Sequence, residues 1–159
     1  MIERETTGTW ESEAPGPGPE HQRLEVFIGK WINQGETVPA GGASAAKILT
    51  SDVYEWLPGR LAVLHTAYGR MGELDVGGVE IIRYDAERGR YTSHFFDSQG
   101  HLTVDELRYD DGKWVWSGAR IRTTSTFSED GKLQHSLHEQ TDDGVEWRPA
   151  MDVTLRRVD

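Results

Sequence analysis

Residues 85–144 contain five acidic glycine turns at the spacing of successive hairpins: Asp85-Ala-Glu-Arg-Gly89, Asp97-Ser-Gln-Gly100, Asp110-Asp-Gly112, Ser128-Glu-Asp-Gly131 and Asp142-Asp-Gly144. Asp-Gly pairs supply the positive backbone angles that tight hairpin turns need. The segments between the turns are rich in Tyr, Phe, Trp, Val, Ile and Thr, which is typical of strands. The stretch therefore predicts an antiparallel meander.

A meander of this length has to protect its edge strands, and closure into a barrel is the common way to do so. We expect strands over residues 31–38, 46–56, 60–68, 79–84, 90–97, 102–109, 113–120, 121–127, 134–140 and 146–158. Leu24, Phe27 and Ile28 recur at helical spacing, which predicts a short helix across one end of the barrel. Residues 69–78 are predicted to form a long glycine-bearing loop at the mouth.

Composition indicates one domain. The chain has 159 residues, no cysteine and a net charge of −10. Residues 1–18 alternate Pro and Gly near their end and predict a flexible tail, so the barrel domain is expected over residues 19–159. Disulfides and thiol chemistry are excluded. Nucleic acid is not an expected partner because phosphate neutralisation needs a basic face. No apolar stretch of ~20 residues is present, which predicts a cytoplasmic rather than a membrane protein.

Several segments resemble known families. Phe27-Ile-Gly-Lys-Trp31 is similar to the Gly-x-Trp motif that opens lipocalins and related calycin barrels, and Arg156 is placed like the arginine that packs over that tryptophan. From about residue 19 onward the chain resembles a bacterial family of calycin-like proteins of unknown function, in the segments Tyr54-Glu-Trp-Leu-Pro-Gly59, Tyr84-Asp-Ala-Glu, His94-Phe-Phe-Asp-Ser-Gln-Gly100, Phe127-Ser-Glu-Asp-Gly131 and Asp143-Gly-Val-Glu-Trp-Arg-Pro-Ala-Met-Asp-Val-Thr-Leu155. The resemblance implies an all-β, up-and-down antiparallel barrel of the calycin type with a short N-terminal helix, and no established reaction.

Strand alternation suggests which side chains face the interior. His65 shares a face with Val63, and His94 shares one with Phe96. Arginines that alternate with apolar residues are further candidates for a polar spot among aromatic walls. The candidate ligand-binding residues are Tyr54, Trp56, His65, Arg83, His94, Trp116, Arg122 and Trp147. Each of these aromatics and histidines is also explained by plain packing or a rim position.

Metal and cofactor sites are not expected. His135 and His138 lie three residues apart, which on a strand sends them to opposite faces. The sequence contains no phosphate-binding loop, dinucleotide fingerprint or nucleophile elbow.

Two functions remain open. One is a non-catalytic binder of a small hydrophobic or aromatic molecule that carries one anionic or polar oxygen, with a homodimer as a further expected assembly. The other is a cofactor-independent enzyme of the calycin type, such as a cyclase, isomerase or decarboxylase. A haem-binding barrel ranks third because it requires an axial histidine deep in an open cavity.

Overall fold

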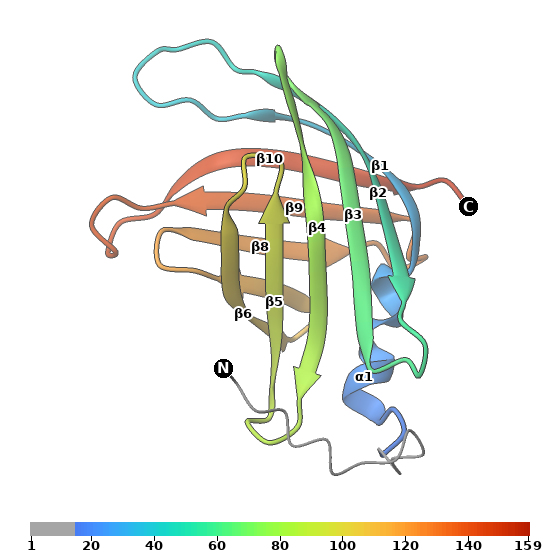
Figure 1. The fold of residues 1–159 in the computed structure, drawn as a ribbon. Coiled ribbons are helices and arrows are strands. Elements are labelled where there is room, and N and C mark those ends of the chain that lie inside the picture. Colours follow the sequence, from blue (N-terminus) through green and yellow to red (C-terminus); the bar gives the residue numbers. More distant parts are fainter. Residues whose placement is uncertain (1–14) are drawn as a thin grey trace.

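The computed structural model describes residues 15–159 and shows a closed barrel of ten antiparallel strands (Figure 1). Helix α1 (Pro19–Arg23) and the 3-10 helix η1 (Leu24–Phe27) precede β1 (Gly29–Thr37), β2 (Lys47–Trp56), β3 (Ala62–Met71), β4 (Leu74–Asp85), β5 (Arg90–Asp97), β6 (Leu102–Asp110), β7 (Lys113–Ser117), β8 (Ile121–Phe127), β9 (Leu133–Gln140) and β10 (Arg148–Arg157). Each strand pairs with its neighbours in sequence, and β1 also pairs with β10 to close the ring. The predicted up-and-down barrel of the calycin type is confirmed.

The turns that define the meander have the backbone angles expected of them. The glycine that ends each of the five turns has a positive φ: 61° at Gly89, 89° at Gly100, 77° at Gly112, 69° at Gly131 and 79° at Gly144. Asp111 also adopts a positive φ of 46°. The acidic glycine turns therefore set the strand boundaries, and β5 and β8 begin and end at the predicted residues.

The prediction of a long loop over residues 69–78 is wrong. Strands β3 and β4 continue through most of this stretch and are joined by a tight turn at Gly72 and Glu73. The glycines serve close backbone approach instead of flexibility. A Cβ at Gly69 would lie 2.0 Å from the carbonyl oxygen of Leu49, so only glycine fits in this paired strand.

One end of the barrel is closed by η1 and a cluster of aromatic rings. Leu24 and Phe27 are fully buried. The ring of Phe27 lies 5.1 Å from Trp114 and 5.2 Å from Phe127, in edge-to-face arrangements. Trp31 is also fully buried and donates its indole N–H to the carbonyl oxygen of Phe27 at 2.9 Å. The expectation of a short helix across one end of the barrel is confirmed.

The arginine that covers Trp31 is Arg157, and the prediction of Arg156 is wrong. The guanidinium carbon of Arg157 lies 4.3 Å from the ring centroid of Trp31. Arg157 also donates to the carbonyl oxygens of Val26 and Ile28, which ties the last strand to the helical plug. Arg156 is exposed. Strand alternation explains the correction, because Arg157 follows the inward residues Val153 and Leu155 at a spacing of two.

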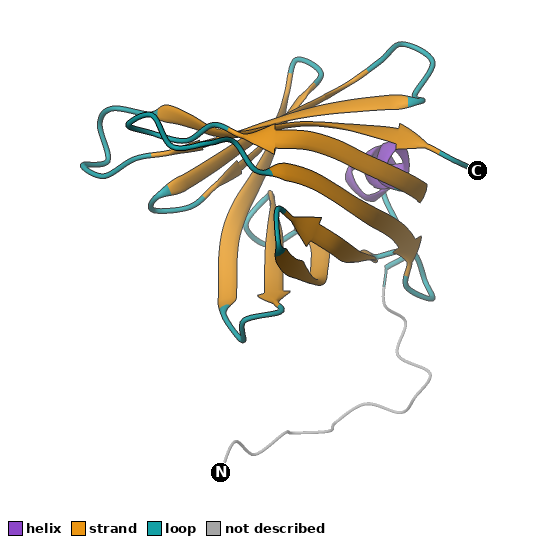
Figure 2. Cartoon of the chain, turned by 90° about the horizontal axis from the view of Figure 1, so that it is seen from above, coloured by secondary structure: helices purple, strands orange, loops and turns teal. Residues whose placement is uncertain are grey.

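At the opposite end of the barrel, several inward-facing side chains are only partly buried. This end carries the start of β2, the turn between β3 and β4, and the start of β10. Figure 2 shows the ring of strands from above, with the loops that join them. The partly buried inward residues include Met71, Phe95, Trp116, His138 and Met151. Solvent therefore reaches the interior from the end away from α1. Within residues 15–159, no helix has the length and apolar character needed to cross a membrane.

Candidate functional site

A buried ionic network lies in the middle of the barrel interior. His65 on β3 stands between two carboxylates, with its Nε2 atom 2.9 Å from Asp52 on β2 and its Nδ1 atom 2.8 Å from Glu80 on β4. All three residues are buried. The ring of Tyr54 stacks on the imidazole at 3.8 Å between centroids and 7° between planes. A protonated imidazole in this position gains both ion pairs and a stacked aromatic face.

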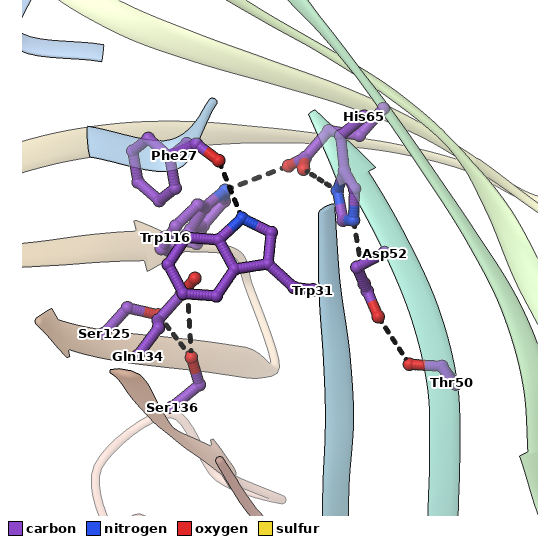
Figure 3. A network of polar contacts seen from close by, with 10 residues as sticks. Phe27, Trp31, Thr50, Asp52, His65, Trp116, Ser125, Gln134 and Ser136 are labelled. Carbon is purple, nitrogen blue, oxygen red and sulfur yellow. Dashed lines mark hydrogen bonds and ion pairs between the residues drawn. The ribbon is translucent and has the colours of Figure 1, made fainter. Parts of the chain in front are cut away.

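The remaining oxygens of the two carboxylates also have partners (Figure 3). Thr50 donates to Asp52 at 2.6 Å. Glu80 accepts hydrogen bonds from the hydroxyl of Ser93 and, at 3.0 Å, from the indole N–H of Trp116. Every polar atom of His65, and each oxygen of its carboxylate partners, therefore has a hydrogen-bond partner within the network.

The network shifts the pKa values of its members so that His65 and Glu80 stay charged and Tyr54 stays neutral. Burial alone would lower the pKa of His65, but the hydrogen bonds and charges of Asp52 and Glu80 outweigh it and raise this pKa from 6.5 to about 9. Burial would raise the pKa of Glu80, but its bonds to His65 hold this pKa below 4.5. Burial, together with the two carboxylate charges, raises the pKa of Tyr54 well above 10. The network is thus an imidazolium held by carboxylates at neutral pH.

A second group of inward side chains forms a row across four neighbouring strands. Trp116 on β7 pairs in register with Thr123 on β8, Thr123 pairs with His138 on β9, and His138 pairs with Met151 on β10. All four residues are only partly buried. The row lies toward the end of the barrel away from α1, where solvent reaches the interior. It combines one large aromatic surface, one hydroxyl, one imidazole and one thioether.

His138 differs from His65 because no carboxylate of residues 15–159 forms an ion pair with it. Burial lowers the pKa of His138 from 6.5 to about 4, against a smaller opposing effect of the Asp152 charge. Its Nδ1 atom lies 2.9 Å from the hydroxyl of Thr123. Within the described residues Nε2 of His138 has no hydrogen-bond partner, and this atom is not fully buried. His138 is therefore neutral at pH 7, with one ring nitrogen free for a bound molecule.

Asp105 on β6 is a further polar group on the inner face. It pairs in register with Ser93 and is partly buried. Burial, with a contribution from the charge of Glu80, raises the pKa of its carboxyl group above 3.8. Among the described residues no cation or hydrogen-bond donor contacts it. Two buried amide oxygens, Asn33 Oδ1 and Gln134 Oε1, also have no partner. The interior therefore contains hydrogen-bonding groups that do not take part in the ionic network.

Three of the eight sequence candidates lie in this interior. Tyr54 and His65 belong to the ionic network, and Trp116 joins the network to the row with His138. Trp56 lies instead beside the helical plug, where its indole N–H donates to Glu25 at 2.7 Å and the guanidinium of Arg60 covers its ring at 5.1 Å.

The other four candidates do not face the interior. Arg83 is exposed, with its nearest carboxylate, Asp85, at 3.6 Å. His94 alternates with the buried Ser93 and so lies on the outer face. Arg122 lies on the face of β8 opposite to the buried Ser125. Its guanidinium forms an ion pair with Glu139 at 2.9 Å and covers the ring of Trp147 at 4.5 Å. The inward orientation expected for Arg83, His94 and Arg122 is wrong, because each lies on the strand face opposite to the inward residues. Trp147 precedes β10, so the inward face of that strand does not extend to it.

The residues that sequence reasoning missed are Asp52, Glu80, Asp105, Thr123 and His138. Alternation could have found two of them. Asp52 is two residues before Tyr54, and Glu80 is two residues before the fully buried Ile82. The opposite orientation expected for His135 and His138 is confirmed: His135 is exposed and contacts Asp152 at 2.7 Å on the outer face. No local signal indicated which of the two imidazoles faces inward.

Two solved structures have a similar fold. The S-type phycobiliprotein lyase CPES from Guillardia theta aligns with a TM-score of 0.63 and 11% identity, covering 88% of this chain and 93% of that one. Rv2717c from M. tuberculosis aligns with a TM-score of 0.63 and 12% identity, covering 89% of this chain and 99% of that one. At such identities the likeness shows the fold alone.

Sequence comparison with curated proteins gives no match. A family described as "Protein of unknown function (DUF1579)" matches residues 16–116. The matched region is more than half of the chain and includes the ionic network, with Asp52, His65 and Glu80, as well as Trp116. His138 lies beyond it. The chain belongs to this family of proteins of unknown function, DUF1579.

Proposed function

We propose that this protein binds a small, mostly apolar molecule inside the barrel, which enters from the end away from α1. The row of Trp116, Thr123, His138 and Met151 carries the proposal, since it offers apolar surface and one unpaired, neutral imidazole nitrogen at a place that solvent reaches. Ligand sites in proteins commonly combine apolar walls with a few such polar groups.

The charges of the interior favour a neutral ligand. Asp52, Glu80 and Asp105 face inward, and among residues 15–159 His65 is the one inward cation close to them. Arg83 and Arg122, which the sequence suggested as partners for an anionic oxygen, lie on the outer face. A carboxylate ligand would meet repulsion in this interior. The polar oxygen of the ligand is therefore a hydroxyl or a similar neutral group.

A hydroxyl also matches either tautomer of His138. If Nδ1 donates to Thr123, Nε2 is an acceptor, and if Nδ1 accepts from Thr123, Nε2 is a donor. A hydroxyl on the ligand can donate or accept and so pairs with Nε2 in both cases. His65 cannot play this role because both of its ring nitrogens are occupied by carboxylates.

An enzymatic function is the second candidate, and Asp105 is the observation that favours it. Asp105 and His138 both face the barrel interior. The raised carboxyl pKa of Asp105 suits it to act as an acid, and the neutral imidazole of His138 suits it to act as a base. One structural neighbour is named as a lyase. Substrate turnover that is lost in both Asp105→Asn and His138→Gln, with ligand binding retained, would favour this candidate over binding alone.

Calorimetric titration with 2-naphthol and 2-naphthoate tests the binding proposal, because these ligands share a ring system and differ in charge. We expect 2-naphthol to bind more tightly. His138→Leu should weaken its binding about tenfold, the equivalent of one hydrogen bond of about 1.4 kcal/mol.

His135→Gln is the matched control, since His135 is on the same strand and the outer face. Tighter binding of 2-naphthoate, or an equal loss of affinity in His135→Gln, would contradict the proposal. Failure of both compounds to bind would contradict it as well.

A further inference from the structure

A groove of about 520 Å³ lies at the rim of the plugged end, outside the interior site. It is bounded by α1, by the turn between β4 and β5, and by the end of β6. Four arginines line it: Arg23, Arg88, Arg90 and Arg108. Glu20 and Glu106 are the acidic residues among its lining side chains. This concentration of positive charge stands out in a chain whose net charge is −10.

Carboxylates compensate these arginines only in part. Arg90 and Arg108 share Glu106, at 3.0 and 3.7 Å. Arg88 lies 3.4 Å from Asp85, which also has Arg83 at 3.6 Å. Each carboxylate is therefore divided between two guanidinium groups, which leaves donor N–H groups for an added anion.

Arg23 has no carboxylate within ion-pair distance among residues 15–159. Its guanidinium carbon lies 4.7 Å from the ring centroid of Tyr109, and Nη1 contacts the hydroxyl of Tyr91 at 3.4 Å. The hydroxyl of Tyr91 in turn donates to the carbonyl oxygen of Glu20 at 2.7 Å. The tyrosine contacts hold Arg23 against the groove and do not neutralise its charge.

The groove also provides aromatic surface. Tyr84 and Tyr109 line it with accessible rings, whereas Tyr91 and Leu107, which also line it, are buried. Tyr109 is 40% exposed. The volume falls within the range of about 300–1,000 Å³ that is common for small-molecule sites. Guanidinium groups bind phosphate oxygens in bidentate pairs, and tyrosine rings contact flat apolar groups.

We propose that this groove binds a small phosphate monoester with an aromatic or heterocyclic ring. The phosphate meets the guanidinium groups of Arg88, Arg90 and Arg108, and the ring packs against the tyrosines beside Arg23. This site is separate from the interior row with His138, so its ligand and its variants are independent of the function proposed above.

Phenyl phosphate, phenol and inorganic phosphate are suitable probes for calorimetric titration of the full-length chain at low ionic strength. We expect phenyl phosphate to bind more tightly than inorganic phosphate, and phenol not to bind in the groove. In the double variant Arg88→Gln/Arg108→Gln the affinity for phenyl phosphate should fall at least about tenfold. Both side chains are largely exposed, at 66% and 69%, so the variant should fold normally.

Two controls separate this proposal from general charge and from the interior site. Arg70→Gln removes an arginine of similar exposure at the far end of the barrel and should leave the affinity for phenyl phosphate unchanged. His138→Leu should also leave it unchanged, whereas the arginine double variant should leave binding of 2-naphthol unchanged.

Three results would overturn the proposal. The first is the absence of phenyl phosphate binding in the wild-type protein, and the second is an unchanged affinity in the double variant. The third is equal binding of inorganic phosphate and phenyl phosphate, which would remove the role of the tyrosine surface.

Discussion

Two histidines face the interior of this barrel, and their surroundings shift their pKa values in opposite directions. His65 lies between Asp52 and Glu80, which raise its pKa to about 9. Within the described residues, the hydrogen-bond partner of His138 is the hydroxyl of Thr123, and burial lowers the pKa of His138 to about 4. At neutral pH one imidazole is charged and fully paired, whereas the other is neutral and has a free nitrogen.

The difference separates a structural role for His65 from the binding role that we propose for His138. The network around His65 satisfies each of its own polar atoms, so its contribution is to hold β2, β3 and β4 together across the interior. In the row with His138, the Nε2 atom of the imidazole has no hydrogen-bond partner within the described residues, and it lies in the row that also holds Trp116 and Met151. A ligand site requires hydrogen-bonding groups that are free to pair with the ligand, in an interior that solvent can reach.

Loss of Trp31 should have the largest effect and should reach only one of the two histidines. Trp31→Ala leaves a cavity in the aromatic plug, and we expect the free energy of unfolding to fall by about 3–5 kcal/mol in denaturant titrations. Trp31 pairs in register with Asp52, so we expect the cavity to loosen Asp52 and weaken its ion pair with His65, which would lower the pKa of His65. Trp147→Ala is the control, since Trp147 is only partly buried and lies outside the plug. An equal loss of stability in both variants would contradict the account of the plugged end.

Removal of the charge on Glu80 should have the next largest effect. In Glu80→Gln, the imidazolium of His65 loses an ion pair while the hydrogen-bonding shape is largely kept. We expect the free energy of unfolding to fall by about 2–3 kcal/mol, since the affected group is buried and charged. The matched change His138→Gln should cost about 1 kcal/mol or less, because only one neutral hydrogen bond is involved. A larger cost at His138 would reverse the assignment of roles.

The dependence of stability on pH should show both histidines. The raised pKa of His65 stabilises the fold fully below pH 6.5, and this contribution is lost as the pH rises through about 9. The lowered pKa of His138 has the opposite sign: its contribution is present above pH 6.5 and is lost as the pH falls toward about 4. Thermal unfolding across this range should show the alkaline decline weakened in His65→Gln and the acidic decline weakened in His138→Gln. Declines of wild-type steepness in both variants would contradict these pKa shifts.

Deletion of the N-terminal segment should have the smallest effect. The sequence of residues 1–18 predicts a tail, and residues 1–14 lie outside the described part of the chain. Deletion of residues 1–14 should change the free energy of unfolding by about 1 kcal/mol or less. Both interior pKa values should stay unchanged. A chain that fails to fold after this deletion would show that the segment belongs to the barrel.

Much of the fold was predictable because its signals are local. Turn glycines with positive φ, alternation along strands and Leu24 and Phe27 at helical spacing all act over a few residues. The site was less predictable because it depends on which strands close beside each other. Alternation groups His94 with Phe96, but only the barrel shows that this face is outside and that Ser93 faces in. The possible homodimer and the boundary of the domain at residue 19 stay predictions.

A pH titration of the imidazole resonances by NMR tests the central claim most directly, with His65→Gln and His138→Gln used to assign the two signals. The account predicts that one interior histidine titrates near pH 9 and is His65, and that the other titrates near pH 4 and is His138. It also predicts that 2-naphthol perturbs the His138 resonances and leaves those of His65 unchanged. Titration of both residues near pH 6.5, or a perturbation by 2-naphthol confined to His65, would contradict the division of the interior into a paired network and a free binding row.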